Sequence, residues 1–159
     1  MNNFKGEEYL NEMKSMVDKA LHRLKSEQPE FKIYTICIWT DLKAVSDTYQ
    51  GYSSIGFDNL ENSLRLVEKR HEYERKYNWQ IDESMTRIYN PADLYYTDYE
   101  VLKHKHMVNN WRILSPLLLQ IGKYTLTKLK ELNIPVDGKM ELTLNTKSDW
   151  CGKIIKWKP

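Results

Sequence analysis

The chain has 159 residues, with 41% hydrophobic side chains, 29% charged side chains and a formal net charge of +2. This length and balance are ordinary for one soluble globular domain with a buried core. No apolar run reaches the roughly 18 residues of a membrane span, which excludes a transmembrane helix. We therefore expect a single domain over residues 1–159.

The first predicted element is a helix over about residues 4–27. Apolar side chains recur there at steps of three and four residues, and charged side chains occupy the other face. Pro29, which cannot continue a helix, follows it. The next segment, residues 33–39, is apolar at both odd and even positions. That pattern is typical of a strand buried on both faces, so we expect this strand at the centre of a sheet.

A loop is expected after this strand, and a second strand over about residues 49–57. Asp41 would then end the central strand and shape the following turn, as aspartates between elements commonly do. The same position suits a catalytic carboxylate, so Asp41 is also the first residue to consider for chemistry.

A second helix is expected over about residues 60–77, with Asp58 or Asn59 accepting hydrogen bonds from its first backbone N–H groups. The apolar residues of its buried face are Leu60, Leu64 and Val67. Its second half, EKRHEYERKYN, is mostly polar, so we expect it to project into solvent.

The middle of the chain carries weaker patterns. The segment MTRIYN, residues 85–90, is typical of a short strand, and Asn90 followed by Pro91 is a helix start signal. A second start signal, Ser115 followed by Pro116, predicts a long helix that ends near Leu132.

The tail has the pattern of a hairpin. The segment KMELTLNT alternates apolar and polar side chains, as in a strand with one solvent-exposed face. KSDW supplies turn residues, and WCGKIIKWK returns as the last strand. Paired neighbouring strands with helices around them predict an α+β fold. We expect a mostly antiparallel sheet of four to six strands, flanked by helices, in a single domain.

The two cysteines, Cys37 and Cys151, fall within predicted strands. The first residues, MNNFKGEEYL, lack the basic and apolar regions of a secretory signal, so we expect a cytoplasmic protein. Buried free thiols are the expectation in that reducing compartment. A disulfide stays open if the two strands are neighbours.

Signatures of catalysis are missing from the sequence. It contains no Gly-x-Ser-x-Gly elbow and no glycine-rich loop that opens a helix. Only His104 and His106 lie close together among the four histidines, and no cysteine pair accompanies them. We therefore expect no catalytic residues, no metal and no cofactor, and an enzyme is the less favoured hypothesis.

Two alternatives stay open. A carboxylate- or metal-dependent enzyme would draw on acids in loops or at element ends, namely Asp41, Asp47, Asp93, Asp98 and Glu100. A single-strand nucleic-acid binder would use basic residues beside tryptophans: Lys103, Lys105, Arg112, Lys153, Lys156 and Lys158 beside Trp111 and Trp157. The small net charge makes nucleic acid the less favoured partner.

The segment YTICIWTD, placed after an amphipathic helix, resembles the start of an uncharacterised bacterial domain family. Members of that family occur among candidate immunity proteins of polymorphic-toxin systems. The resemblance extends over residues 5–135 and includes YNPADLYY, where Leu94 or Tyr95 stands in place of an expected tryptophan. It implies a cytoplasmic protein that binds and blocks a toxin domain, and it carries over no catalytic residues.

Eleven tyrosines and five tryptophans also favour a protein-binding domain, because these residues are enriched at interface centres. The acidic segment YYTDYE could face a basic nuclease-type toxin. The candidate partner-binding residues are Tyr95, Tyr96, Asp98, Tyr99 and Glu100 of this region, together with Trp111. The alternative is that the three tyrosines pack inward beside a loop.

Overall fold

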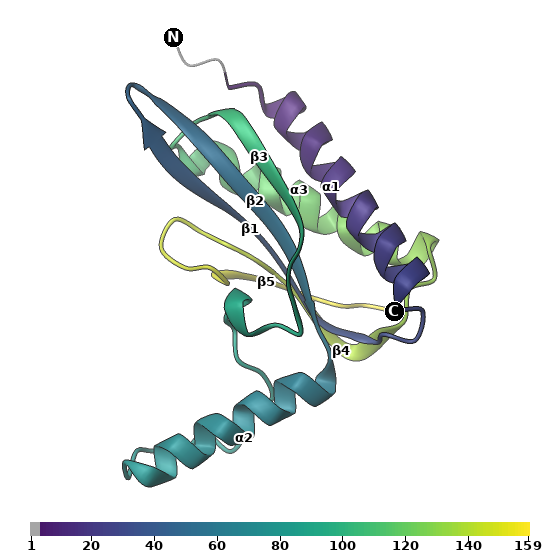
Figure 1. Cartoon of the computed structure of the whole chain (residues 1–159), viewed down its shortest axis with the longest axis vertical. Coiled ribbons are helices and arrows are strands. Elements are labelled where there is room, and N and C mark those ends of the chain that lie inside the picture. Colours follow the sequence, from purple (N-terminus) through teal and green to yellow (C-terminus); the bar gives the residue numbers. More distant parts are fainter. Residues whose placement is uncertain (1–3) are drawn as a thin grey trace.

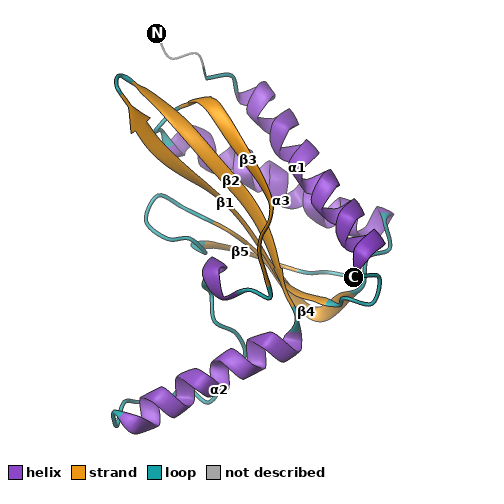
Figure 2. Ribbon diagram, in the orientation of Figure 1, coloured by secondary structure: helices purple, strands orange, loops and turns teal. Residues whose placement is uncertain are grey.

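The computed structural model describes residues 4–159. Its elements follow in the order α1 (Gly6–Glu27), β1 (Ile33–Val45), β2 (Thr48–Asp58), α2 (Leu60–Lys76), η1 (Pro91–Asp93), β3 (Tyr96–Met107), α3 (Trp111–Glu131), β4 (Val136–Leu144) and β5 (Lys153–Lys156). The strands of this region form one five-stranded sheet in the order β3-β2-β1-β4-β5. The β1–β4 pair is parallel, and the other three neighbouring pairs are antiparallel. The predicted α+β fold with a mostly antiparallel sheet is confirmed (Figure 2).

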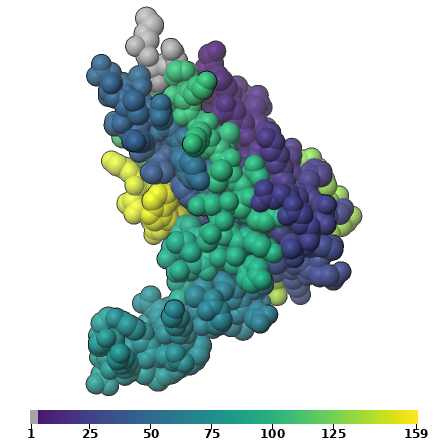
Figure 3. Space-filling model, in the orientation of Figure 1, coloured from purple at the N-terminus to yellow at the C-terminus, as the bar shows by residue number. Residues whose placement is uncertain are grey.

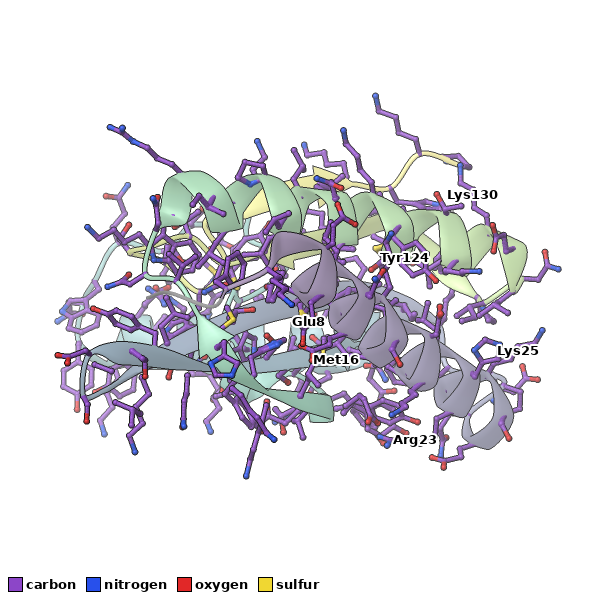
Figure 4. The ribbon with its side chains drawn as sticks, turned by 90° about the horizontal axis from the view of Figure 1, so that it is seen from above. Glu8, Met16, Arg23, Lys25, Tyr124 and Lys130 are labelled. Atoms are coloured by element: carbon purple, nitrogen blue, oxygen red, sulfur yellow. The ribbon has the colours of Figure 1, made fainter. Side chains whose placement is uncertain are left out.

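Helices α1 and α3 cover one face of the sheet, whereas α2 extends away from it (Figure 1). Figure 4 looks onto α1 and α3 and shows Tyr124 of α3 pointing toward α1. The Tyr124 hydroxyl lies 2.8 Å from both carboxylate oxygens of Asp18 on α1. This contact joins the two helices above the core. No helix within residues 4–159 is both long enough and apolar enough to cross a lipid bilayer.

The main hydrophobic core lies between these two helices and the sheet. Its fully buried side chains include Met13, Val17 and Leu21 of α1, Leu114, Leu118 and Ile121 of α3, and Ile36, Ile38, Ile55, Phe57 and Leu142 of the sheet. Each large apolar side chain buried in this way stabilises the fold by about 2 kcal/mol. The apolar periodicity of α1 is satisfied by this packing.

Strand β1 is the third of the five strands, as its doubly apolar pattern predicted. The helices cover one of its faces. On the other face, Cys37 packs with Leu94 and Cys151 in a smaller cluster, with Trp39 beside it. Because loops rather than helices cover this second face, part of the sheet there is open to solvent.

The prediction that Asp41 ends the central strand is wrong. Strand β1 continues to Val45, and β2 begins at Thr48, so the two strands form a long hairpin. The outer half of this hairpin extends beyond the helices (Figure 1). Its side chains are mostly exposed, and polar residues are therefore tolerated where a buried strand would need apolar ones. That is why residues 40–48 resemble a loop in the sequence.

Helix α2 begins where expected, and the Asn59 side chain accepts a hydrogen bond from the Asn62 backbone N–H at 2.8 Å. Its expected buried face is only partly right. Val67 is buried, but Leu60 and Leu64 are 40% and 47% exposed. The reason is that α2 does not pack on the sheet. It forms a projecting arm, which is prominent in the space-filling view (Figure 3).

The middle of the chain differs most from expectation. Residues 85–90 are not a strand, and the start signal at Asn90 opens only the short turn η1. The following residues form β3, a long strand at the edge of the sheet. Helix α3 begins at Trp111 with Asn110 as its cap, so Pro116 lies inside the helix. The tail forms the expected hairpin of β4 and β5, but Cys151 lies in the turn before β5.

Candidate protein-binding surface

The three candidate tyrosines lie in a row at the start of β3. The Tyr95 and Tyr96 ring centroids are 4.9 Å apart, and those of Tyr96 and Tyr99 are 5.1 Å apart. Tyr96 and Tyr99 are partly buried and pack against the main core, where their rings contact Phe31 and Phe57. Tyr95 is exposed. Only Tyr95 therefore offers most of its ring to a partner.

The two candidate acids have partners within the chain. Glu100 accepts a hydrogen bond from Arg23 of α1 at 2.9 Å, and the Arg23 guanidinium also lies 3.9 Å from the centroid of the Tyr99 ring. Asp98 is exposed, has a backbone φ of 46° and accepts a hydrogen bond from Ser54 at 2.6 Å. The acidic character expected for this region is therefore partly neutralised by α1.

Trp111 lies at the opposite end of β3 from the tyrosine row. It is partly buried against the main core and borders a cleft of about 350 Å³. The cleft is also lined by Asp41 and by the loop of residues 145–150. The Asp41 side chain accepts a hydrogen bond from the Leu42 backbone N–H at 2.9 Å. The structure therefore separates Trp111 from the other candidate partner-binding residues.

The candidate catalytic acids and histidines do not form a metal centre. Among residues 4–159, no group of three His, Cys, Asp or Glu side chains could hold a metal ion. His104 and His106 both lie on β3, but His104 is buried and His106 is exposed. A register irregularity between β2 and β3 lies at this end of the strand.

A chain of hydrogen-bonded polar side chains links α1 to strands β1, β2 and β3. Tyr9 contacts Thr40 at 2.8 Å, Thr40 contacts Ser53 at 2.6 Å, and Ser53 contacts His104 at 2.8 Å. The other ring nitrogen of His104 lies 2.8 Å from a Glu12 carboxylate oxygen. The order serine, histidine, carboxylate matches that of a nucleophilic triad. However, Ser53 is 0% exposed, so its hydroxyl is closed to any substrate. This chain is a structural feature of the core.

The most exposed aromatic group lies on the α2 arm, outside the candidate residues predicted from the sequence. Tyr73, Tyr77 and Trp79 are 53%, 47% and 58% exposed. Their ring centroids lie 4.6 Å apart for Tyr73–Tyr77, 5.8 Å for Tyr73–Trp79 and 5.6 Å for Tyr77–Trp79. We call these three residues the aromatic tip. The four-residue spacing of the two tyrosines was visible in the sequence, but the return of Trp79 onto them was not.

The end of α2 explains how Trp79 reaches the tyrosines. Asn78 has a φ of 53°, which turns the chain back on itself. The Trp79 backbone N–H then donates to the Glu74 carbonyl at 2.8 Å, and the Asn78 N–H donates to the Arg75 carbonyl at 3.2 Å. This pair of bonds is a Schellman motif, in which the residue after the left-handed position packs on the last helical turn. The three rings are therefore held together before any partner binds.

Asp58 fixes the base of the arm. Its buried carboxylate accepts hydrogen bonds from the Asn62 side chain at 2.7 Å and from the Tyr95 backbone N–H at 3.1 Å. It also accepts one from the Ser63 hydroxyl. One carboxylate thus ties the first turn of α2 to the chain that carries the tyrosine row.

Comparison with known proteins identified no relative: the chain matches no family model, no curated protein and no solved structure. What the structure defines is an α+β domain with a projecting helical arm that ends in exposed aromatic rings.

Proposed function

We propose that this chain is a non-catalytic protein-binding domain whose partner contacts the aromatic tip of α2. The observation that carries the proposal is the gathering of Tyr73, Tyr77 and Trp79 on one exposed end of the arm. Tyrosine and tryptophan dominate the energetic centres of protein interfaces. Because the three rings already contact one another, binding of a partner would cost them little side-chain entropy.

The partner class follows from the resemblance to candidate immunity proteins. On that basis the partner is a bacterial toxin domain, the complex blocks the toxin, and the protein acts in the cytoplasm. The side chains around the tip support a partner of mixed charge. Lys76 lies 5.6 Å from the centroid of the Tyr77 ring, and Arg75 pairs with Glu68 at 2.5 Å. Both signs of charge are therefore present beside the rings.

The tyrosine row is a second part of the proposed surface. Tyr95, just before β3, is exposed, and its backbone N–H donates to Asp58 at the base of the arm; Asp98 lies exposed near the start of β3. Tyr96, Tyr99 and Glu100 are proposed to position this segment, because they are partly buried against α1 and the core. Trp111 lies at the other end of β3 and is outside this surface.

The proposal predicts that a neighbouring gene encodes the toxin domain, and co-expression with the product of that gene tests it. We expect the two chains to co-purify and the toxin to lose its activity. Trp79→Ala and Tyr73→Ala should each weaken the complex by about 30-fold, and together by roughly 1,000-fold, since each interface hot spot contributes about 2 kcal/mol. Leu64→Ala is the matched control, because Leu64 is a similarly exposed apolar residue on the same helix.

Two results would count against the proposal. The first is failure of the two chains to associate or to neutralise toxicity. The second is equal affinity for the tip variant, the Leu64→Ala control and the unmodified protein. The unfolding midpoint of each variant should be measured in parallel, so that a loss of binding is not confused with a loss of fold.

A further inference from the structure

The two cysteines meet on the face of the sheet that the helices leave uncovered. Cys37 lies in the centre of β1 and Cys151 lies 114 residues later, in the turn before β5. Their sulfur atoms are 3.9 Å apart. Cys37 is 1% exposed and Cys151 is 8% exposed. Formation of a disulfide would need the sulfurs to approach by about 2 Å more.

The loop that carries Cys151 is ordered by its own hydrogen bonds. The Cys151 backbone N–H donates to the Asp149 carboxylate at 2.9 Å, and the Thr146 N–H donates to the Asp149 carbonyl at 2.8 Å. A Cβ placed on Gly152 would lie 2.5 Å from the Thr146 hydroxyl oxygen, so the loop closes tightly on itself. These contacts hold Cys151 over Cys37.

The two thiols have unequal acidity. A hydrogen bond from Cys37 lowers the pKa of Cys151. The same contact, together with burial, raises the pKa of Cys37 well above its ordinary value. Since the thiolate is the reactive form of cysteine, these directions favour Cys151 as the attacking sulfur. Cys151 is also the more exposed of the two.

We propose that Cys37 and Cys151 form a reversible dithiol–disulfide pair that reacts with small disulfides while the protein stays folded. The Cys151 thiolate attacks one sulfur of the small disulfide, which forms a mixed disulfide and releases one thiolate. Cys37 then attacks the Cys151 sulfur, its proton passes to the leaving group, and the second small thiol departs. The net reaction converts two protein thiols and one disulfide into a protein disulfide and two small thiols.

The Cys37–Cys151 disulfide would restrain Trp150 on the face of the sheet that the helices leave uncovered. The Trp150 ring packs edge-on against Trp39 of β1, with centroids 5.2 Å apart and planes at 78°. Trp150 borders both the cleft of about 350 Å³ near Asp41 and a second cleft of about 210 Å³ beside Asn90. Closure of the disulfide would therefore hold the shared wall of these two clefts against β1.

The test uses the full-length, folded protein with 2-hydroxyethyl disulfide as the probe, in the absence of denaturant. Free thiols should fall from two per chain to none. Non-reducing peptide mapping should find Cys37 joined to Cys151 within one chain. In Cys37→Ser, the reaction should stop at a stable mixed disulfide on Cys151. In Cys151→Ser, Cys37 should stay unreacted, because it is buried and lacks its attacking partner.

A second readout follows the loop itself. Trypsin cleavage after Lys147, an exposed residue of this loop, should slow in the oxidised protein and recover after reduction. Circular dichroism before and after oxidation checks that the fold persists. The proposal is overturned if both thiols survive in the folded protein, if only a mixed disulfide accumulates in the unmodified chain, or if the bond forms only between chains. Equal cleavage rates in the two redox states would refute the effect on the clefts.

Discussion

His104 on β3 and Glu12 on α1 lie 2.8 Å apart through Nδ1 and a carboxylate oxygen, and this contact determines the direction of a whole hydrogen-bond chain. The Glu12 carboxylate can only accept a hydrogen bond, so Nδ1 of His104 must carry the proton. Nε2 of the neutral ring then accepts a hydrogen bond from the Ser53 hydroxyl. The Thr40 hydroxyl then donates to Ser53, and the Tyr9 hydroxyl donates to Thr40. Burial raises the pKa of Tyr9 to about 12 and outweighs the lowering effect of its hydrogen bonds. The Tyr9 hydroxyl therefore keeps its proton and remains a donor.

This chain predicts a loss of stability in weak acid. Burial lowers the pKa of His104 from 6.5, and this effect outweighs the opposing hydrogen bond and charge of Glu12. Between the lowered pKa and 6.5, the unfolded chain binds a proton at this site that the folded chain does not. The contribution of His104 to the free energy of unfolding is therefore complete above pH 6.5 and declines as the pH falls below 6.5.

Urea unfolding from pH 8 to pH 5 measures this dependence. His104→Gln removes the titrating ring and should flatten the part of the profile that His104 contributes. It should also lower the free energy of unfolding by about 2 kcal/mol at neutral pH, because buried polar partners are left unsatisfied. Parallel profiles for the variant and the unmodified protein would show that another group causes the pH dependence.

Asp58 should control the attachment of the α2 arm. Asp58→Ala removes the acceptor for Asn62, Ser63 and the Tyr95 backbone. We expect the free energy of unfolding to fall by about 2–3 kcal/mol, since two buried side-chain donors and the Tyr95 N–H lose one charged acceptor. Amide hydrogen exchange in the first turn of α2 should rise by more than exchange in α1. Asp47→Ala, at the exposed tip of the β1–β2 hairpin, is the matched control and should change stability by less than about 0.5 kcal/mol.

Arg87 should stabilise the loop on the uncovered face of the sheet. It is buried, donates to the Tyr34 and Lys139 carbonyls at 3.2 Å and 2.7 Å, and lies 3.2 Å from the Glu141 carboxylate. Its guanidinium carbon also lies 3.8 Å from the centroid of the Tyr34 ring. Arg87→Met should lower the free energy of unfolding by about 3 kcal/mol, because it leaves a half-buried carboxylate without its cation.

The double variant Arg87→Met with Glu141→Gln tests that reason. It should recover part of the loss, because the unpaired charge is gone. If the double variant is no more stable than Arg87→Met, the carbonyl and ring contacts of Arg87 account for its effect, and the ion pair does not. Chemical denaturation of the four proteins of this cycle gives the coupling energy directly.

The turn of the β1–β2 hairpin offers a stabilising change. Ser46 has a φ of 52°, in the left-handed region that is costly for residues with a Cβ. Ser46→Gly should raise the free energy of unfolding by about 0.5 kcal/mol, because glycine adopts this conformation without strain. The thermal midpoint should rise accordingly. A fall in the midpoint would mean that the greater freedom of glycine in the unfolded chain dominates.

Several elements follow from the sequence because local physics determines them. The apolar period of α1 and the Asn59 cap of α2 depend on residues within a few positions of one another, and both are confirmed. The doubly apolar pattern of residues 33–39 identified the centre of the sheet. Strand β3 was missed because an edge strand is half exposed and carries charges, so its pattern lacks the usual alternation.

Sequence alone therefore determined the fold class, the central strand and the lack of familiar catalytic motifs. Tertiary structure decided which distant side chains meet: Glu12 with His104, Cys37 with Cys151, and Trp79 with the tyrosines of α2. The first contact depends on helix α1, which packs over the sheet, and the second depends on the loop before β5, which lies on the opposite face. The third depends on one left-handed residue, Asn78. Local propensities depend on residues that are neighbours in the sequence, whereas contacts between remote residues form only when the sheet is assembled.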